Sequence, residues 1–116
     1  YKVPSENMVY ADTKGNIGWI ASGLAPVRRN WNGLFPVPGE NGEYEWDGYL
    51  PVEKMPQEFN PPRHYIATAN HKILPSGYKE QLSYSWALPF RYQRIVELLS
   101  GSGKLSVADF ERIQQD

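Results

Sequence analysis

The sequence reads GLFPVPG over residues 33–39, YEWDGYLP over residues 44–51 and NPPRHYIATAN over residues 60–70. Prolines, glycines and aromatic residues follow one another here without low-complexity bias, so the backbone is constrained at many points. The last part, Tyr65–Ala69, is almost entirely apolar or small and predicts a short buried strand that delivers Asn70 at its end. A rigid loop that ends in one polar donor is a way for a fold to place a catalytic group.

The sequence before and within this stretch predicts β structure and loop. Met8–Asp12 and Ile17–Ala21 are β-prone runs, and the residues between them include Gly15 and Asn16. Glycine and asparagine supply the positive φ angles of a tight turn, so we expect a β-hairpin. Residues 22–62 are punctuated by proline and glycine, which predicts a long loop with at most short strands. Such a length of irregular chain is unusual in a small domain and fits a segment draped over a larger body.

The end of the chain predicts two helices. Pro89 suits the first position of a helix that ends near residues 100–103. Ser106 and Asp109 have the spacing of a capping box and predict the start of a second, final helix. Apolar residues recur at helical spacing in the first of these helices: Phe90, Ile95, Leu98 and Leu99. The expected fold class is therefore α+β, with a hairpin, short strands, a long Pro/Gly-rich loop and two C-terminal helices.

Composition and charge exclude several classes of function. A chain of 116 residues can bury one modest core, so we expect one domain. The net charge of −1 and the dispersed basic residues give no surface for nucleic acid. The chain has no cysteine, so it holds neither a disulfide nor a thiolate site. No apolar run approaches the roughly 20 residues that span a bilayer, and we predict no membrane segment.

Several separated motifs identify a family. They are YADTKGNIG at 10–18, PVR at 26–28, PVPG at 36–39, YEW at 44–46 with Gly48, YIATAN at 65–70, Arg91, and Arg94 with Ile95. In this order and spacing, they resemble the penicillin acylase (penicillin amidase) family over nearly the whole chain. Members of that family are N-terminal-nucleophile hydrolases that cleave amide bonds.

The resemblance implies how the chain fits into a larger enzyme. Penicillin acylases are much longer and are cut into two chains, so residues 1–116 look like a single interior segment of the larger, beta chain. The fold would then be a fragment of the αββα N-terminal-nucleophile hydrolase fold. Its partners would be the smaller alpha chain and the rest of the beta chain, in the bacterial periplasm or outside the cell. Tyr1 cannot be the nucleophile, so we expect the segment to be inactive alone.

Asn70 and Arg91 are the candidate catalytic residues. Negative charge develops on the carbonyl oxygen during amide hydrolysis, and a fixed amide N–H can stabilise it by about 3 kcal/mol. From residue type alone, Asn70 would more often simply end a strand by bonding nearby backbone. The matching family position is the oxyanion-hole asparagine, which implies that role for Asn70. The resemblance likewise implies that Arg91 lies beside this asparagine and the substrate and orients them, with Arg94 the weaker choice.

The resemblance also implies a mechanism and a substrate class. The N-terminal nucleophile of the larger chain attacks the amide carbon, an acyl-enzyme forms, and water releases the acid. The substrates would be small molecules with linear amide bonds, penicillin-like or otherwise N-acylated, and members of the wider family accept phenylacetyl, phenoxyacetyl and longer fatty acyl groups. The family binds structural calcium in the full enzyme. No acid here matches that site, so we predict no metal ligand and no cofactor within the segment.

Two other patterns have simpler explanations. His64 and His71 lack a recognisable metal-ligand spacing and are best interpreted as loop or surface histidines. His71 also departs from the resemblance, because a second asparagine commonly follows the oxyanion residue. In residues 43–47 acids alternate with aromatic residues, which predicts a strand or loop with aromatic rings inward and acids in water.

The competing hypothesis is a non-catalytic, aromatic-rich β module that binds sugar or peptide. It is supported by four tryptophans and eight tyrosines. Exposed coplanar rings would favour this alternative, whereas rings buried under the loop at residues 33–62 would favour the acylase interpretation.

Overall fold

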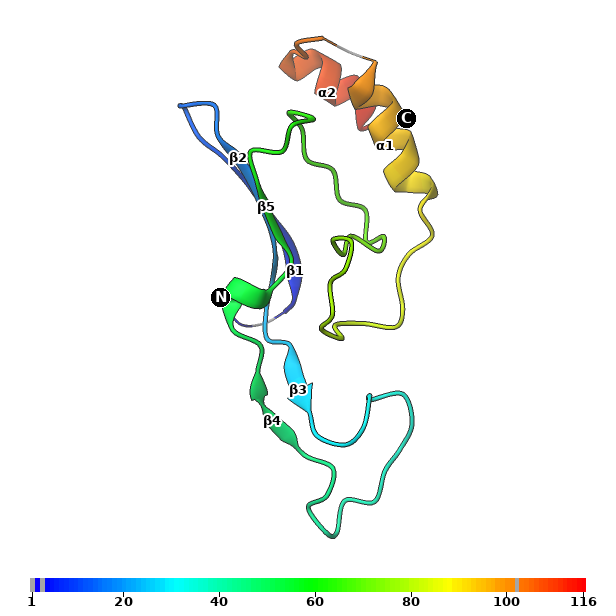
Figure 1. Ribbon diagram of the computed structural model, residues 1–116. Helices are drawn as coiled ribbons and strands as arrows, with labels where there is room; N and C mark the ends of the chain where they lie inside the picture. Colours follow the sequence, from blue (N-terminus) through cyan, green and yellow to red (C-terminus); the bar gives the residue numbers. More distant parts are fainter. Residues whose placement is uncertain (1, 3, 102) are drawn as a thin grey trace.

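The computed structural model describes residues 2, 4–101 and 103–116 of an elongated molecule of 58 × 30 × 26 Å. Figure 1 shows a small sheet, a narrow arm at one end and two helices toward the other. The predicted α+β class, with short antiparallel strands and two C-terminal helices, is confirmed. In chain order the elements are β1 (Glu6–Ala11), β2 (Ile17–Ser22), β3 (Pro26–Arg28), β4 (Trp46–Tyr49), the 3₁₀ turn η1 (Val52–Lys54), β5 (Gln57–Phe59), α1 (Phe90–Ser100) and α2 (Val107–Ile113).

The predicted hairpin is confirmed. Strands β1 and β2 pair antiparallel along their whole length. In the turn between them, Gly15 has a φ of +86°, a conformation that disfavours a side chain. The carboxylate of Asp12 accepts hydrogen bonds from the backbone N–H groups of Lys14 and Asn16, each at 2.9 Å. These bonds stabilise the turn by an Asx-type cap.

The sheet is completed from the other side by β5. The strand order is β1-β2-β5, so β2 is the central strand, and its Trp19 is only 5% exposed. The indole Nε1 of Trp19 donates to Oδ1 of Asn7 at 2.9 Å, which satisfies its polar end. In the described part of the chain the other buried apolar residues include Ala25, Met55, Ala67 and Ala69. The core is small and lies where the loop around residues 67–71 meets the central strand.

The arm is a two-stranded ribbon of β3 and β4. An exposed ion pair between Arg29 and Asp47 links its two sides. The expectation that aromatic rings in residues 43–47 point inward is wrong for Trp46, which is 55% exposed. A two-stranded ribbon has too little apolar surface of its own to bury an indole.

The predicted strand at Tyr65–Ala69 is also wrong. Residues 60–89 contain no helix or strand and run between the sheet and α1 (Figure 1). Left-handed backbone at His64 (φ 58°) and Asn70 (φ 59°) brackets the stretch and prevents a continuous extended strand. Burial was predicted correctly for Ala67 and Ala69, because both small residues are buried.

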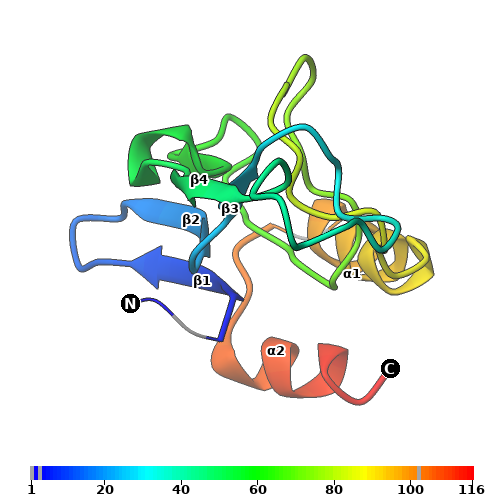
Figure 2. The same ribbon diagram turned by 90° about the horizontal axis from the view of Figure 1, so that it is seen from below.

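Both predicted helices are present. Helix α1 begins after Pro89 and ends at Ser100, while Ser102 lies outside the described residues. The capping box of α2 is confirmed, with the backbone N–H of Ser106 donating to the Asp109 carboxylate at 2.7 Å. In Figure 2 α1 is seen nearly end-on and α2 lies across the view, so the two helices are not parallel. None of the helices in the described ranges is long and apolar enough to cross a bilayer.

Candidate active site

Asn70 lies in a loop and is held there by its backbone. Its φ of 59° is left-handed, a region that asparagine tolerates better than most residues with a side chain. The carbonyl oxygen of Asn70 accepts a hydrogen bond from the backbone N–H of Ala87 at 2.9 Å. This bond joins the loop to the chain that enters α1, so Asn70 is placed between two segments rather than within a strand.

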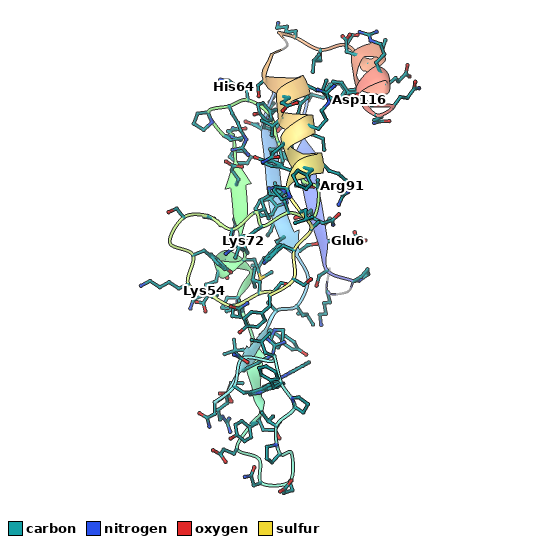
Figure 3. All side chains as sticks on the ribbon, turned by 90° about the vertical axis from the view of Figure 1, so that its right-hand side faces the viewer. Glu6, Lys54, His64, Lys72, Arg91 and Asp116 are labelled. Carbon is teal, nitrogen blue, oxygen red and sulfur yellow. The ribbon has the colours of Figure 1, made fainter. Side chains whose placement is uncertain are left out.

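Arg91 lies in the first turn of α1 and reaches back to this loop. Its Nη2 donates to the carbonyl oxygen of Ala69 at 2.9 Å and to Oδ1 of Asn70 at 3.0 Å. Figure 3 shows Arg91 at the end of α1 nearer the middle of the molecule. The two residues that the sequence singled out are therefore in direct contact.

This contact fixes which way the Asn70 amide faces. A guanidinium carries only donors, so the amide atom against it must be the oxygen. Within the described part of the chain, Nδ2 of Asn70 has no hydrogen-bond partner. A positive charge beside the amide oxygen also polarises the group and strengthens its N–H as a donor. The arrangement thus presents one oriented, unused amide donor.

A cavity of 540 Å³ lies beside this donor, and Asn70 and Arg91 form part of its wall. Apolar side chains contribute to the same wall, among them Met55, Leu74 and Trp86. Polar groups contribute to the lining almost as much as apolar ones, which suits a small organic ligand that carries polar groups of its own. A carbonyl group held there could accept a hydrogen bond from Nδ2 of Asn70.

The two histidines have different surroundings. His64 is exposed and lies near the other end of α1 from Arg91 (Figure 3). His71 is in a loop, as expected, but is only 9% exposed, and burial lowers the pKa of its imidazole. Its ring stacks on Tyr92, with centroids 3.7 Å apart and planes inclined by 18°. Among the described residues no group of three or more acids or histidines is placed to hold a metal ion.

Arg94 is not part of the site. Its guanidinium is engaged with Glu97 at 3.2 Å and with the side chain of Asp116 at 2.6 Å. Asp116 lies beyond α2, so Arg94 links the two helices at their exposed side.

Tyr92 is the residue beside the site that the sequence analysis missed. The sequence does contain a signal for Tyr92, because His71 directly follows Asn70 and Tyr92 directly follows Arg91. Once Asn70 and Arg91 are expected to meet, their neighbours in sequence are expected to lie close as well.

The exposed rings of Trp46 and Tyr49 in the arm do not form the coplanar platform that a sugar-binding module would need. Trp46 and Tyr49 are both exposed, but their planes are inclined by 69° in an edge-on arrangement, with centroids 6.3 Å apart. Trp19 is buried in the sheet and Trp86 is half-buried at the cavity. This geometry disfavours the binding-module alternative, which requires coplanar exposed rings.

The chain is similar to known acylases. It matches the penicillin amidase family over residues 1–116. It is 47% identical over 98 residues to an acyl-homoserine lactone acylase, QuiP, of Pseudomonas fluorescens, a match that covers 84% of this chain and 12% of that protein. It is 35% identical over 104 residues to penicillin G acylase of Escherichia coli, covering 86% of this chain and 12% of that protein.

A solved structure agrees with these relatives. The thermostable penicillin G acylase of Alcaligenes faecalis has a TM-score of 0.76 and 28% identity, over 97% of this chain and 20% of that one. This chain thus spans only a small part of the length of the proteins it matches. Because the family match covers every residue and the relatives align at such identities, the chain belongs to the penicillin amidase family.

Proposed function

We propose that this chain supplies the oxyanion donor of an amide-hydrolysing acylase. The donor is the side-chain N–H of Asn70, and Arg91 is the group that orients it. The observation that carries the proposal is the hydrogen bond from Arg91 to Oδ1 of Asn70 at 3.0 Å, which leaves Nδ2 as an oriented, unused donor at a cavity wall.

The chemistry needs such a donor when the amide carbon is attacked. An N-terminal nucleophile from another part of the acylase adds to the carbon, and the carbonyl oxygen becomes an oxyanion. The N–H of Asn70 bonds more strongly to that oxyanion than to the neutral carbonyl, and it therefore lowers the barrier. The amine then leaves, and water releases the acid from the acyl-enzyme.

Arg91 acts on Asn70 rather than on the reacting atoms in this proposal. Its Nη2 also bonds the carbonyl oxygen of Ala69, so it ties the backbone and the side chain of the loop to one point on α1. A donor that is fixed before the reaction requires no reorganisation when the charge develops. The positive charge also increases the donor strength of Asn70.

The segment is proposed to work inside a longer acylase and to be inert alone. It covers only 12–14% of the curated relatives' length. Many large apolar side chains are exposed, including Phe35 at 76% and Phe90 at 68%, and such surface is suited to contact with other parts of an enzyme. The partners would be the rest of the larger chain and a smaller chain, and one relative is itself named a proenzyme.

The proposed substrates are small N-acyl compounds with a linear amide bond, including penicillin-like ones. This class is supported by the names of the relatives, which are acyl-homoserine lactone acylases and penicillin acylases. Each name describes an acylase, and the family resemblance implies that the acyl group is removed from an amide nitrogen. The shared feature is the amide carbonyl, which is the group that Asn70 is proposed to bind.

The test is Asn70→Ala in the intact acylase, assayed on chromogenic phenylacetyl and fatty-acyl anilides that the unaltered enzyme hydrolyses. We expect kcat to fall by about 10²–10³, the typical loss of one oxyanion donor, with a smaller change in KM. Asn70→Asp keeps the shape and the partner of Arg91 but has no N–H, so it should lose as much.

The matched control is Asn30→Ala. Asn30 is another left-handed asparagine, with a φ of 60°, but it lies in the arm, where its side chain bonds the Glu43 carbonyl. Its kcat should stay near that of the unaltered enzyme. Full turnover by a correctly folded Asn70→Ala variant would overturn the proposed function.

A further inference from the structure

The loop of Asn70 has few backbone bonds to hold it. It belongs to residues 60–89, which contain neither helix nor strand, so no ladder of hydrogen bonds fixes its position. Among the described residues, the hydroxyl groups of Tyr65 and Ser100 are 3.1 Å apart at the far end of α1, and near Asn70 the bonds that join the loop to α1 and its approach come from Arg91 and from the N–H of Ala87. A donor must nevertheless be held to within about 0.5 Å to act on a transition state.

A second contact joins the same two segments on the other side. The ring of His71 stacks on the ring of Tyr92 at 3.7 Å, one residue after Asn70 and Arg91 respectively. His71 is only 9% exposed, and its Nδ1 is buried with no hydrogen-bond partner among the described residues. The imidazole is therefore held by its flat ring rather than by its polar atoms.

The stack lies behind the site and not within it. Asn70 and Arg91 line the 540 Å³ cavity, whose walls include neither His71 nor Tyr92. His71 and Tyr92 instead line a separate cavity of 460 Å³, together with the buried Trp19 of the central strand. The loop and the first turn of α1 thus form a partition with the amide donor on one side and the stacked rings on the other.

We propose that the His71–Tyr92 stack positions Asn70 for catalysis by clamping its loop to α1. This inference rests on the proposed function, and both rings are positioning residues that do not touch the substrate. A stacked pair constrains the separation and tilt of two planes, whereas a single hydrogen bond leaves rotation about its own axis free. The clamp and Arg91 then hold the loop from two sides, so the direction of the Asn70 N–H is set before the substrate binds.

The experiment replaces each stacked ring by leucine, which removes the stacking but still fills most of the space that the ring occupied. In the intact acylase, Tyr92→Leu and His71→Leu should each lower kcat roughly 3- to 10-fold, the range expected for loss of an aromatic pair, with KM changed less. Tyr92→Phe and His71→Phe keep flat rings and should retain kcat. Trp46→Leu removes an exposed edge-on ring pair in the arm and should leave turnover unchanged.

A double variant separates positioning from general loss of structure. If the stack acts through Asn70, Tyr92→Leu should reduce kcat no further when Asn70 is already alanine. Equal further loss in that background, or unchanged kcat in Tyr92→Leu alone, would overturn the clamp. If the leucine variants do not fold, His71→Phe is the test of the clamp. A folded His71→Phe enzyme should retain kcat, whereas a greatly reduced kcat would show that the imidazole itself is needed and would overturn the clamp. Full activity of Asn70→Ala would instead remove the proposed function on which the clamp rests.

Discussion

Two asparagines ten positions apart, Asn60 and Asn70, share the same residue type and the same left-handed backbone, with φ angles of 47° and 59°. Their side chains differ in how they are hydrogen-bonded. Asn60 uses both ends of its amide, because Oδ1 accepts from the backbone N–H of Ile17 at 2.9 Å and Nδ2 donates to Asn16 at 2.8 Å. Toward the described residues, the Asn70 side chain uses only Oδ1, which accepts from Arg91.

The hydrogen-bond partners of the side chain distinguish a structural asparagine from a functional candidate. A side chain that is hydrogen-bonded at both ends of its amide stabilises the fold, as Asn60 does between the hairpin turn and the end of β5. A side chain that is fixed at one end and unpaired at the other retains capacity to bind. The backbone conformation is the same in both, so it carries no information about the role.

After the loss of Asn70 itself, the largest effect we predict in this comparison comes from removing the group that fixes Asn70. Arg91→Lys should lower kcat by about 10- to 100-fold, because a hydrogen bond to a charged group is lost and the shorter ammonium cannot reach both oxygens. The thermal midpoint should change little, since Arg91 is exposed. Steady-state kinetics of the intact acylase measure this. Unchanged kcat would mean that Asn70 needs no orienting partner.

The next effect concerns the turn to which Asn60 is attached. Gly15→Val should destabilise the hairpin by about 1–2 kcal/mol, because a β-branched residue is forced into left-handed backbone. A Cβ there would meet no atom within 4 Å, so the cost is backbone strain and not a clash. Gly39→Val is the matched control, since its Cβ also meets nothing within 4 Å and its φ is not left-handed. Denaturant unfolding should separate the two variants.

A smaller effect is expected at Asn60 itself. Asn60→Ala should reduce stability by about 1 kcal/mol, because the N–H of Ile17 and the side chain of Asn16 lose their partner. Its kcat should remain within roughly twofold of the unaltered enzyme, since Asn60 is not part of the cavity wall around Asn70. Measuring stability and kcat on the same preparation compares Asn60→Ala directly with Asn70→Ala. A large loss of kcat with intact stability would contradict the division of roles.

The sequence predicted elements whose cause is local. The hairpin turn follows from Gly15 and Asn16, and the start of α2 follows from Ser106 and Asp109, because each of these signals acts within a few residues. The meeting of Asn70 and Arg91 was expected from the family resemblance. Periodicity alone could not have shown it, since the two residues are separated by a segment without regular structure.

The sequence failed where distant contacts decide the outcome. Tyr65–Ala69 has strand-like composition, but left-handed residues at both ends and the absence of a pairing strand keep it irregular. The prediction that the Trp46 ring points inward was wrong, because alternation of residue types predicts burial only when another part of the molecule covers that face of the strand. The stack of His71 on Tyr92 likewise depends on how the loop meets α1, which no local pattern specifies.

The smallest effect we predict is the pH dependence of the turn. Hydrogen bonds from the side chain and backbone of Asn16, with further ones from Tyr10 and Lys14, lower the pKa of Asp12 from 3.8 to about 2. A carboxylate with a depressed pKa stabilises the fold fully above its unfolded value and loses that contribution as the pH falls through the folded value. The stabilisation by Asp12 should therefore be complete above about pH 4 and decline toward pH 2. Thermal midpoints of the unaltered protein and of Asp12→Asn should converge over that range. A difference that stays constant from pH 5 to pH 2 would show that the Asp12 carboxylate is not held by the turn, and the network joining it through Asn16 to Asn60 would lose its first member.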